Sequence, residues 1–430
     1  MSTQSQLDKA VVKELHDQVD SYLEDCLLPF WMENSPDPEY GGFLSYFDEH
    51  GRPTGETAKT FLMQARLLYS FSAAHRTGYG GQLSREMAED AADFILEHYW
   101  DPRHGGWYWV TDRRGRPTVR DKVGYGQCFG IYAFSEYYMA TGDERACKAA
   151  LDTYSAVMQH MADSRHGGFV ELMKPDWKPR GPGRQGGDRK SLDVHMHMME
   201  ALTSLYMMTE QSTHARRLRE VIGLILDRML EPESGTGYFQ FEMDFTPIPA
   251  IEFDVTWGRD AEPDEGERPL DHTSPGHNVE LAWLLLRAAD ALGEPRDRYA
   301  DTVRKLCDHC ADYGIDDTYG GVYAETPMDR PTELTEKQFW QQAEGMIGML
   351  DAYELLDDPA YWRGFRNVYD FLFDNMVAMD AGGEWRERVD RRGRPVDPAL
   401  AHAWKINYHS VRGMLEVEKR LRRMLESDAE

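Results

Sequence analysis

The sequence predicts an all-α protein in which about twelve helices form an (α/α)6 barrel, with short β-hairpins at one mouth. Two observations support this prediction. A glycine-rich, aromatic signal recurs six times in the 430 residues, mostly at intervals of about 60 to 70 residues. Between consecutive signals the apolar residues follow a helical period. Because six such units can close into a ring, we expect a single domain over residues 1–430 without linkers.

The repeated signal has the composition of a tight turn followed by a short strand. Its six copies are Tyr40-Gly-Gly-Phe, His104-Gly-Gly-Trp, His166-Gly-Gly-Phe, Gly235-Thr-Gly-Tyr, Tyr319-Gly-Gly-Val and Gly382-Gly-Glu-Trp. Glycine supplies the backbone angles that tight turns need, and the alternating residues after most copies suit an antiparallel pair. We therefore expect six hairpins.

Each interval between hairpins contains two helical segments separated by a short break, such as Gly142-Asp143. The expected helices cover residues 7–33, 58–77, 84–99, 125–141, 144–162, 191–211, 214–230, 277–292, 296–313, 336–356, 360–377 and 404–425. Six of them would line the ring and six would cover it from outside.

The charge balance limits the classes of partner. Lysine plus arginine total 48 and aspartate plus glutamate total 75, so the net charge is −27. Such a surface repels phosphate backbones and anionic lipids, and we expect neither nucleic-acid nor membrane partners. The longest apolar run, residues 281–286, is far shorter than the roughly 20 residues that span a bilayer. We expect a cytoplasmic protein that is a monomer or a homodimer.

Two further features have structural interpretations. Cys307 and Cys310 form a CxxC motif, but no second pair completes a zinc site, so helical packing is the better interpretation. The acidic stretch around residues 260–268 is interpreted as an inserted, solvated loop, and its place beside the next motif also suits an active-site lid.

Unusual polar residues follow every hairpin, on the helix that we expect to line the ring. In chain order they are Arg66, Tyr125, Gln127, Asp193, His195, His197, Glu200, His277, Asn278, Glu280, Trp340, Gln342, Glu344, Trp404, Lys405, Tyr408 and His409. If these six helices form the inner ring, the side chains converge on one mouth of the barrel.

Several of these residues also have a purely structural explanation. Arg66 alone on an apolar face could pair with a core carboxylate, and His277 could simply bond to Glu280, which shares its helix face. His195 and His197 are two residues apart, so at most one of them should face the site. We expect no metal, because the HxH pair lacks a third ligand. The repeated placement of these polar residues after the hairpins nevertheless favours a functional role over a purely structural one.

The chemistry that remains is acid–base work by histidine and carboxylate. The sequence contains no GxSxG elbow, no phosphate-binding loop and no complete GxGxxG after a strand. An aromatic-lined concave mouth with several polar groups suits a sugar, whose rings stack on tryptophan while its hydroxyls need donors and acceptors.

The chain resembles the N-acylglucosamine 2-epimerase superfamily, particularly its cellobiose 2-epimerase branch. The resemblance rests on segments 100–109, 125–138, 191–201, 276–285, 339–344 and 404–409, which are spread over nearly the whole sequence. It implies the (α/α)6 fold and, as in most members, no cofactor. The implied partner is a small-molecule sugar.

The resemblance also implies roles for individual residues. It assigns His277 and His409 as the general acid/base pair, Arg66 as the ligand of the reacting C1–C2 oxygens and His197 as the ring-opening histidine. The implied substrate-binding residues are Tyr125, Asp193, Glu280, Trp340, Glu344 and Trp404. Two histidines suit inversion of a carbon next to a carbonyl, because one removes a proton from one face and the other returns a proton to the opposite face.

Two residues depart from the cellobiose branch. Asp193 stands where that branch usually has Asn, and Phe339 replaces the first of a Trp-Trp pair. Less stacking surface and an added carboxylate put a preference for disaccharides in doubt, and make free mannose and glucose credible substrates.

The leading hypothesis is an aldose 2-epimerase that interconverts glucose- and mannose-configured sugars, free or at the reducing end of a disaccharide such as cellobiose. The alternative is a mannose–fructose isomerase on the same scaffold. Hydrolysis of a glycoside by Glu280 and Glu344 is a third hypothesis, because (α/α)6 barrels also carry hydrolases. A non-catalytic sugar-binding module is the fourth.

Overall fold

The computed structural model describes residues 9–254, 266–397 and 399–426, and it confirms the predicted (α/α)6 barrel. The inner helices are α3 (Phe61–Thr77), α5 (Gly124–Thr141), α7 (Leu192–Thr209), α9 (Pro275–Leu292), α11 (Phe339–Leu356) and α13 (Asn407–Glu426). Each contacts the next, and α13 contacts α3, so the ring closes. Most of the proposed lid around residues 260–268 lies outside the described residues.

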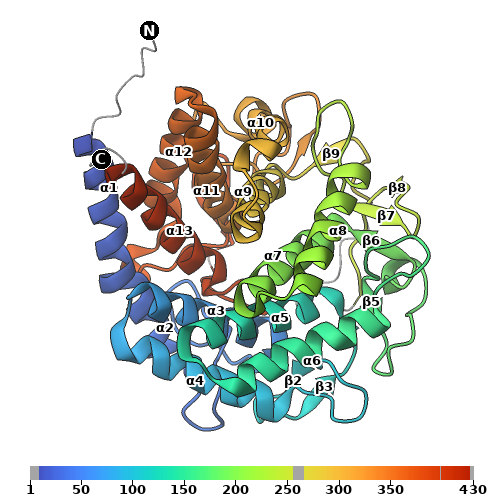
Figure 1. The fold of residues 1–430 in the computed structure, drawn as a ribbon. Coiled ribbons are helices and arrows are strands. Elements are labelled where there is room, and N and C mark those ends of the chain that lie inside the picture. Colours follow the sequence, from blue (N-terminus) through green and yellow to red (C-terminus); the bar gives the residue numbers. More distant parts are fainter. Residues whose placement is uncertain (1–8, 255–265, 398, 427–430) are drawn as a thin grey trace.

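The outer helices cover the inner ring one by one (Figure 1). They are α1 (Lys9–Tyr22), which continues into α2 (Leu28–Asn34), and α4 (Gly81–His98), α6 (Glu144–His160), α8 (Ser212–Arg228), α10 (Ala300–His309) and α12 (Pro359–Phe371). The predicted first, ninth and eleventh helices each include a π-helical turn, at Leu23–Leu27, Cys310–Gly314 and Leu372–Met376. Helix α1 packs against α13, which joins the two ends of the chain.

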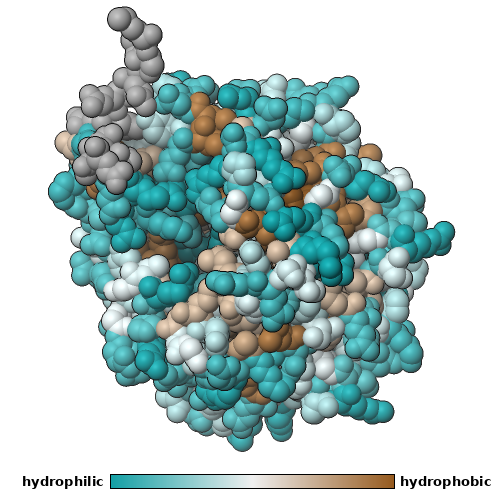
Figure 2. Space-filling view, in the orientation of Figure 1, coloured by the Kyte–Doolittle hydropathy of each residue, from teal (hydrophilic) through white to brown (hydrophobic). Residues whose placement is uncertain are grey.

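Inner and outer helices differ because their surroundings differ. Inner helix α5 is buried from Gly124 through Tyr137, since it meets its ring neighbours on both sides and α6 behind it. Outer helix α6 buries only one face and presents charged residues to solvent, as an amphipathic helix should. Hydrophilic residues spread over most of the face that Figure 2 shows, as the charge predicts. No helix in the described ranges is long and apolar enough to cross a membrane.

The repeated glycine signals form six equivalent tight loops. Each loop is closed by one isolated bridge, at Pro36–Phe43, Trp100–Trp107, Ala162–Phe169, Leu230–Gly237, Ile315–Val322 and Val377–Trp385. Glycine is required in the second loop because Gly106 has φ +71°, and a Cβ there would lie 2.4 Å from Trp177. The expected hairpins are therefore loops with a single bridge, and the longer strands lie elsewhere.

Those strands join neighbouring units. They are β1 (Lys59–Thr60), β2 (Val110–Thr111), β3 (Pro117–Val119), β4 (Lys122–Val123), β5 (Leu172–Met173), β6 (Arg189–Ser191), β7 (Gln240–Glu242), β8 (Pro247–Ile248), β9 (His272–Thr273), β10 (Thr326–Pro327), β11 (Lys337–Gln338), β12 (Arg388–Val389) and β13 (Pro395–Asp397). Antiparallel sheets form in the orders β1-β2-β3, β4-β5, β6-β7-β8, β9-β10 and β11-β12-β13. In each sheet, the strand before an inner helix pairs with a strand of the next unit.

A buried lysine fixes the start of five inner helices. We call these five residues the strand lysines because all but the last lie on a strand. They are Lys59, Lys122, Lys190, Lys337 and Lys405, and their ammonium groups lie 2.8 to 3.1 Å from Asp37, Asp101, Asp163, Asp316 and Glu384 respectively. All five lysine side chains are inaccessible to solvent. In the fourth unit Thr273 replaces the lysine, and its hydroxyl donates to the carbonyl of Gly237. Each loop is thereby held against the helix that follows it.

The last inner helix begins later than the sequence predicted. Its expected range starts at residue 404, but α13 starts at Asn407, so Trp404 and Lys405 precede the helix. Lys405 is the strand lysine of this unit and donates to Glu384 and to the carbonyl of Leu400, which keeps the backbone here out of the helix.

We predict that Lys122→Met lowers the free energy of unfolding by about 3–5 kcal/mol, because it leaves the buried Asp101 carboxylate without its cation. Urea unfolding followed by circular dichroism measures this. The control is Lys148→Met on α6, whose exposed ion pair with Asp152 should contribute little. Equal stability of the two variants would contradict the role given to the strand lysines.

Candidate active site

The candidate residues occupy equivalent places in the first turns of the inner helices. Seven residues after the strand lysine, or after Thr273, the six units carry Arg66, Phe129, His197, Glu280, Glu344 and Arg412. Because the six helices are held at the same height by their loops, these side chains form one ring inside the barrel. His277 and His409 lie four residues after Thr273 and Lys405, nearly one turn closer to the mouth.

His277 and His409 lie against the same indole. The ring centroids of His277 and Trp340 are 4.6 Å apart, and those of Trp340 and His409 are 5.9 Å apart. The side chain of His277 is 24% exposed and that of His409 is 7% exposed. The two imidazoles, from α9 and α13, therefore both contact the indole of Trp340 and lie near one another in the same part of the barrel.

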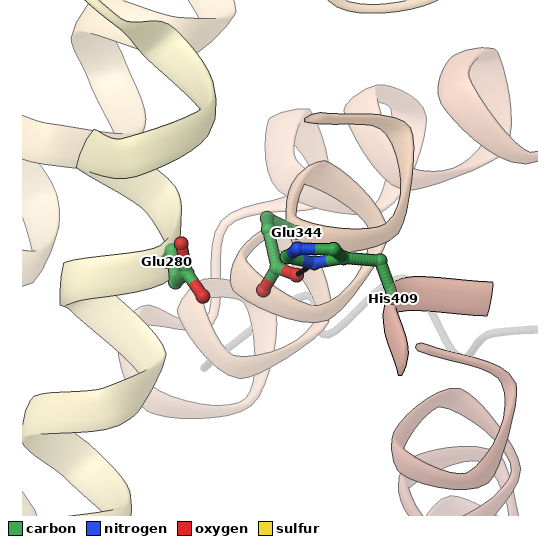
Figure 3. Close-up of side chains that lie close together, drawn as sticks. All are labelled: Glu280, Glu344 and His409. Atoms are coloured by element: carbon green, nitrogen blue, oxygen red, sulfur yellow. Dashed lines mark hydrogen bonds and ion pairs between the residues drawn. The ribbon is translucent and has the colours of Figure 1, made fainter. Parts of the chain in front are cut away.

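His409 is oriented by a carboxylate behind it. Its Nδ1 lies 2.8 Å from Oε1 of Glu344, and Figure 3 shows the two side chains meeting from α13 and α11 with Glu280 opposite them. Burial lowers the pKa of His409 well below its usual value, and the nearby Arg66 and Arg412 lower it further. The ring is therefore neutral at physiological pH. With the Nδ1 hydrogen directed to Glu344, Nε2 carries the basic lone pair.

Arg412 joins three buried carboxylates from three other helices. Its Nη1 donates to Glu200 at 2.6 Å, and its Nη2 donates to Glu280 at 2.8 Å and to Glu344 at 2.6 Å. All four side chains are at most 1% exposed. We call these four residues the Arg412 cluster. It lies directly behind His409 and links α7, α9, α11 and α13.

Burial raises the pKa of both Glu280 and Glu344 in the Arg412 cluster. Glu344 accepts from Arg412, from the Trp283 indole at 2.9 Å and from His409, so it is best stabilised as a carboxylate. Burial, followed by the neighbouring charge of Glu344, raises the pKa of Glu280 to about 8. Glu280 is therefore the protonated member.

Glu280, Glu344 and His409 also satisfy the spacing of a metal site, since one ligand atom from each lies within 4.8 Å of the others. The Nη2 nitrogen of Arg412 already lies between the two glutamates and supplies the positive charge at this point. A divalent cation would have to displace it. The donor set therefore fits the guanidinium better than a metal.

Arg66 stands at the cavity as a cation in aromatic surroundings. Its Nη1 donates to the carbonyl of Trp404 at 2.6 Å, and its Nη2 donates to the Tyr125 hydroxyl at 2.9 Å. The rings of Tyr125, Phe129, Trp404 and Tyr408 lie 5.0 to 5.8 Å from the guanidinium carbon. Among the described residues its hydrogen-bond partners are this carbonyl and this phenol, and no ion pair with a carboxylate is formed. The structural explanation of Arg66, pairing with a core carboxylate, therefore does not apply.

The structure separates the two histidines of the HxH motif. His195 faces away, where its Nε2 accepts from the backbone N–H of Phe169 and its Nδ1 lies 2.7 Å from the carbonyl of Ser191. His197 faces the cavity residues, with Nε2 3.0 Å from the Tyr125 hydroxyl and Nδ1 3.0 Å from Glu200. Asp193 lies between His197 and His277, 3.4 and 3.6 Å from their Nε2 atoms.

Comparison with known proteins agrees with this architecture. Residues 41–413 match the family model described as N-acylglucosamine 2-epimerase (GlcNAc 2-epimerase). The chain belongs to the N-acylglucosamine 2-epimerase family. Cellobiose 2-epimerase of Bacteroides fragilis is 27% identical over 94% of this chain and 98% of that protein. D-mannose isomerase of Marinomonas mediterranea is 24% identical over 92% and 95% of the two chains.

A solved structure of this family superimposes over nearly the whole chain. Cellobiose 2-epimerase from Spirochaeta thermophila has a TM-score of 0.84 and 27% identity, and it covers 97% of this chain and 98% of that one. Matches with glycoside hydrolases of family 76 have a TM-score of 0.62 at 13% identity or less, which shows a shared fold alone.

Among the residues predicted for this family member, Arg66, Tyr125, Asp193, His197, His277, Glu280, Trp340, Glu344, Trp404 and His409 are brought together at one end of the barrel. Sequence reasoning missed Arg412. A signal was present, since Arg412 follows His409 by three residues in a run otherwise free of charge, at the same position as Arg66 in its own unit. Glu200 and Tyr408 stood out as polar residues but received no role.

We predict that Arg412→Met lowers the free energy of unfolding by about 3–5 kcal/mol, because three buried carboxylates lose their common cation. Arg412→Lys should recover part of this loss, since it keeps the charge but not the forked donors. The control is Arg422→Met on the same helix, whose partner Glu418 is 3.6 Å away and whose side chain is half exposed. Chemical unfolding of all three variants measures the effect, and R412M as stable as R422M would refute the role of the cluster.

Proposed function

We propose that this chain is an aldose 2-epimerase that interconverts glucose- and mannose-configured sugars, free or at the reducing end of β-1,4-disaccharides such as cellobiose. The observation that supports this most is the pair of imidazoles that both contact Trp340. Inversion at C2 needs one group that removes the proton next to the carbonyl and another that returns a proton to the opposite face. The cavity offers two such groups.

Both imidazoles are available as bases. Burial lowers the pKa of His277 to about 4, against the opposing effect of Asp193, so this ring is neutral at physiological pH. His409 is neutral because burial and the nearby Arg66 and Arg412 lower its pKa, and its Nε2 is the nitrogen without hydrogen. Each ring can therefore accept a proton without first releasing one.

Ring opening supplies the proton that inversion needs. The closed sugar passes its O1 hydrogen to one of the two neutral imidazoles, while His197 donates a proton to the ring oxygen. The open chain then loses its C2 hydrogen to the second imidazole and receives a proton on the other face from the first. Ring closure returns the proton on the second imidazole to O1 and the ring-oxygen proton to His197. Every proton is thereby accounted for, and no electron leaves the sugar, so the reaction itself needs no redox cofactor.

Arg66 suits the anionic intermediate. Removal of the C2 proton places negative charge on the C1 and C2 oxygens, and a guanidinium stabilises this charge without losing its own proton. The aromatic rings around Arg66 keep water away from it, which strengthens the interaction. Tyr125, Trp340 and Trp404 provide apolar surfaces for the sugar ring.

Isomerisation is the second candidate, because the D-mannose isomerase of Marinomonas mediterranea matches most of this chain. The same bases would then return the proton to C1 instead of C2 and release a ketose. Hydrolysis is disfavoured by geometry, because Glu280 and Glu344 bond to one nitrogen of Arg412 and so lie side by side. A hydrolase needs its two carboxyl groups on either side of the scissile bond.

We predict that incubation with mannose yields glucose as the first product, and that cellobiose yields glucosyl-mannose without released monosaccharide. Chromatography of timed samples, extended to glucose and N-acetylglucosamine, identifies the products. Fructose as an early product from mannose would show isomerisation instead of epimerisation. Free glucose released from cellobiose would show hydrolysis. His409→Ala is the inactive control.

A further inference from the structure

His197 is buried between two carboxylates and so differs from the other histidines of the cavity. Its side chain is 2% exposed, its Nδ1 lies 3.0 Å from Glu200 and its Nε2 lies 3.4 Å from Asp193. A neutral imidazole has one nitrogen without hydrogen, and its lone pair would face either Glu200 from Nδ1 or, from Nε2, Asp193 and the Tyr125 hydroxyl together. Hydrogens on both nitrogens remove this repulsion. The surroundings therefore select the imidazolium.

We propose that Asp193 is the positioning residue that, together with Glu200, holds His197 as an imidazolium and so makes it the acid that opens the sugar ring. The ring-opening part rests on the proposed function, whereas the charge state of His197 does not.

The other charged groups around His197 do not change its assignment as an imidazolium. Burial lowers the pKa of His197, but the hydrogen bonds of Asp193 and Glu200 raise it to about 10. From α9, His277 is neutral and contributes no charge. Arg66 on α3 and Arg412 on α13 are cations, and they are bonded to Tyr125 and to the glutamates of the Arg412 cluster respectively.

The imidazolium form of His197 also determines which hydrogen bonds the Tyr125 hydroxyl can make. Its oxygen already accepts from Nη2 of Arg66 at 2.9 Å, and His197 Nε2 lies 3.0 Å away. If His197 is an imidazolium, Nε2 donates to this oxygen as well, and two cationic donors share one phenol. The hydrogen of Tyr125 is then left for a third partner, and the sugar is the group that enters next to it.

Asp193 also lies between two histidines that need different charge states, one neutral and one cationic. Its carboxylate lies 3.6 Å from Nε2 of His277, which is an electrostatic contact longer than a hydrogen bond. His277 must be neutral to accept a proton, and His197 must be charged to donate one. The closer contact with His197 and its second carboxylate, Glu200, account for this difference.

The test is Asp193→Asn, which keeps the shape of the side chain and removes its charge. NMR of the full chain with selectively labelled histidine, without sugar, should show His197 doubly protonated through pH 8 in the wild type. In D193N its pKa should fall by about 1–3 units, because one opposite charge at this distance has been lost. His197→Gln identifies the signal. Asp176→Asn, at an exposed ion pair with Lys178, is the matched control and should leave the titration unchanged.

Mutarotation measures ring opening separately from chemistry at C2. Because an imidazolium with a lower pKa is lost at a lower pH, D193N should catalyse interconversion of the glucose anomers more slowly than wild type at pH 8, by up to about tenfold if the pKa falls by 3 units, and should recover towards pH 6. The same His197 titration in D193N and wild type, or a neutral His197 in the wild type at pH 7, would overturn the inference. If the titration shifts but neither enzyme interconverts the sugars, the proposed function fails and the charge assignment stands.

Discussion

The candidate site depends on the guanidinium of Arg412 and the three carboxylates around it. Four inner helices meet at this point, and none of the four side chains can be solvated there. Buried charges of this kind are costly unless they are paired and fully hydrogen-bonded. Because Glu344 is held by Arg412 and Trp283, it presents a fixed oxygen to His409. The orientation of a proposed catalytic base is thus set by the packing of the barrel.

Charge balance explains how so many ionisable groups coexist in one cavity. The cations are Arg66, His197 and Arg412, and the anions are Asp193, Glu200 and Glu344, with Glu280 protonated. Three charges of each sign cancel. His277 and His409 are left neutral, and these are the two groups that the proposed reaction requires as bases.

Local sequence signals predicted the fold well, because the same pattern of one glycine-rich loop and two helices occurs six times along the chain. Helical periodicity placed all twelve helices, and the glycine signals placed the six loops. The cross-unit strands were not predicted, since a strand of two residues such as Lys59–Thr60 has no period, and its partner Val110–Thr111 lies far along the chain. Nor could the sequence show that Lys405 is fixed by Glu384, which is why the start of α13 was placed too early.

The residues of the candidate site were likewise predicted only in part. Residues on the cavity side stood out because polar groups are unusual on helices that are otherwise apolar. Arg412 was missed because its importance lies in three partners on other helices, at separations of 68 to 212 residues. The ion pairs of the strand lysines were missed for the same reason, although Lys405 stood out as a polar residue. Buried ion pairs between distant segments are recognised only once the ring has been closed.

In the proposed reaction His277 and His409 each serve one face of C2, and variants that keep only one of these bases distinguish their roles. In heavy water, His277→Gln and His409→Gln should each lose epimerisation. From the open-chain sugar in solution, each should still exchange the C2 hydrogen of one epimer with retention of configuration, with glucose exchanged by one variant and mannose by the other. NMR of recovered sugar reads both the label and the configuration. Exchange of the same epimer by both variants, or of both epimers by either one, would contradict the two-base account.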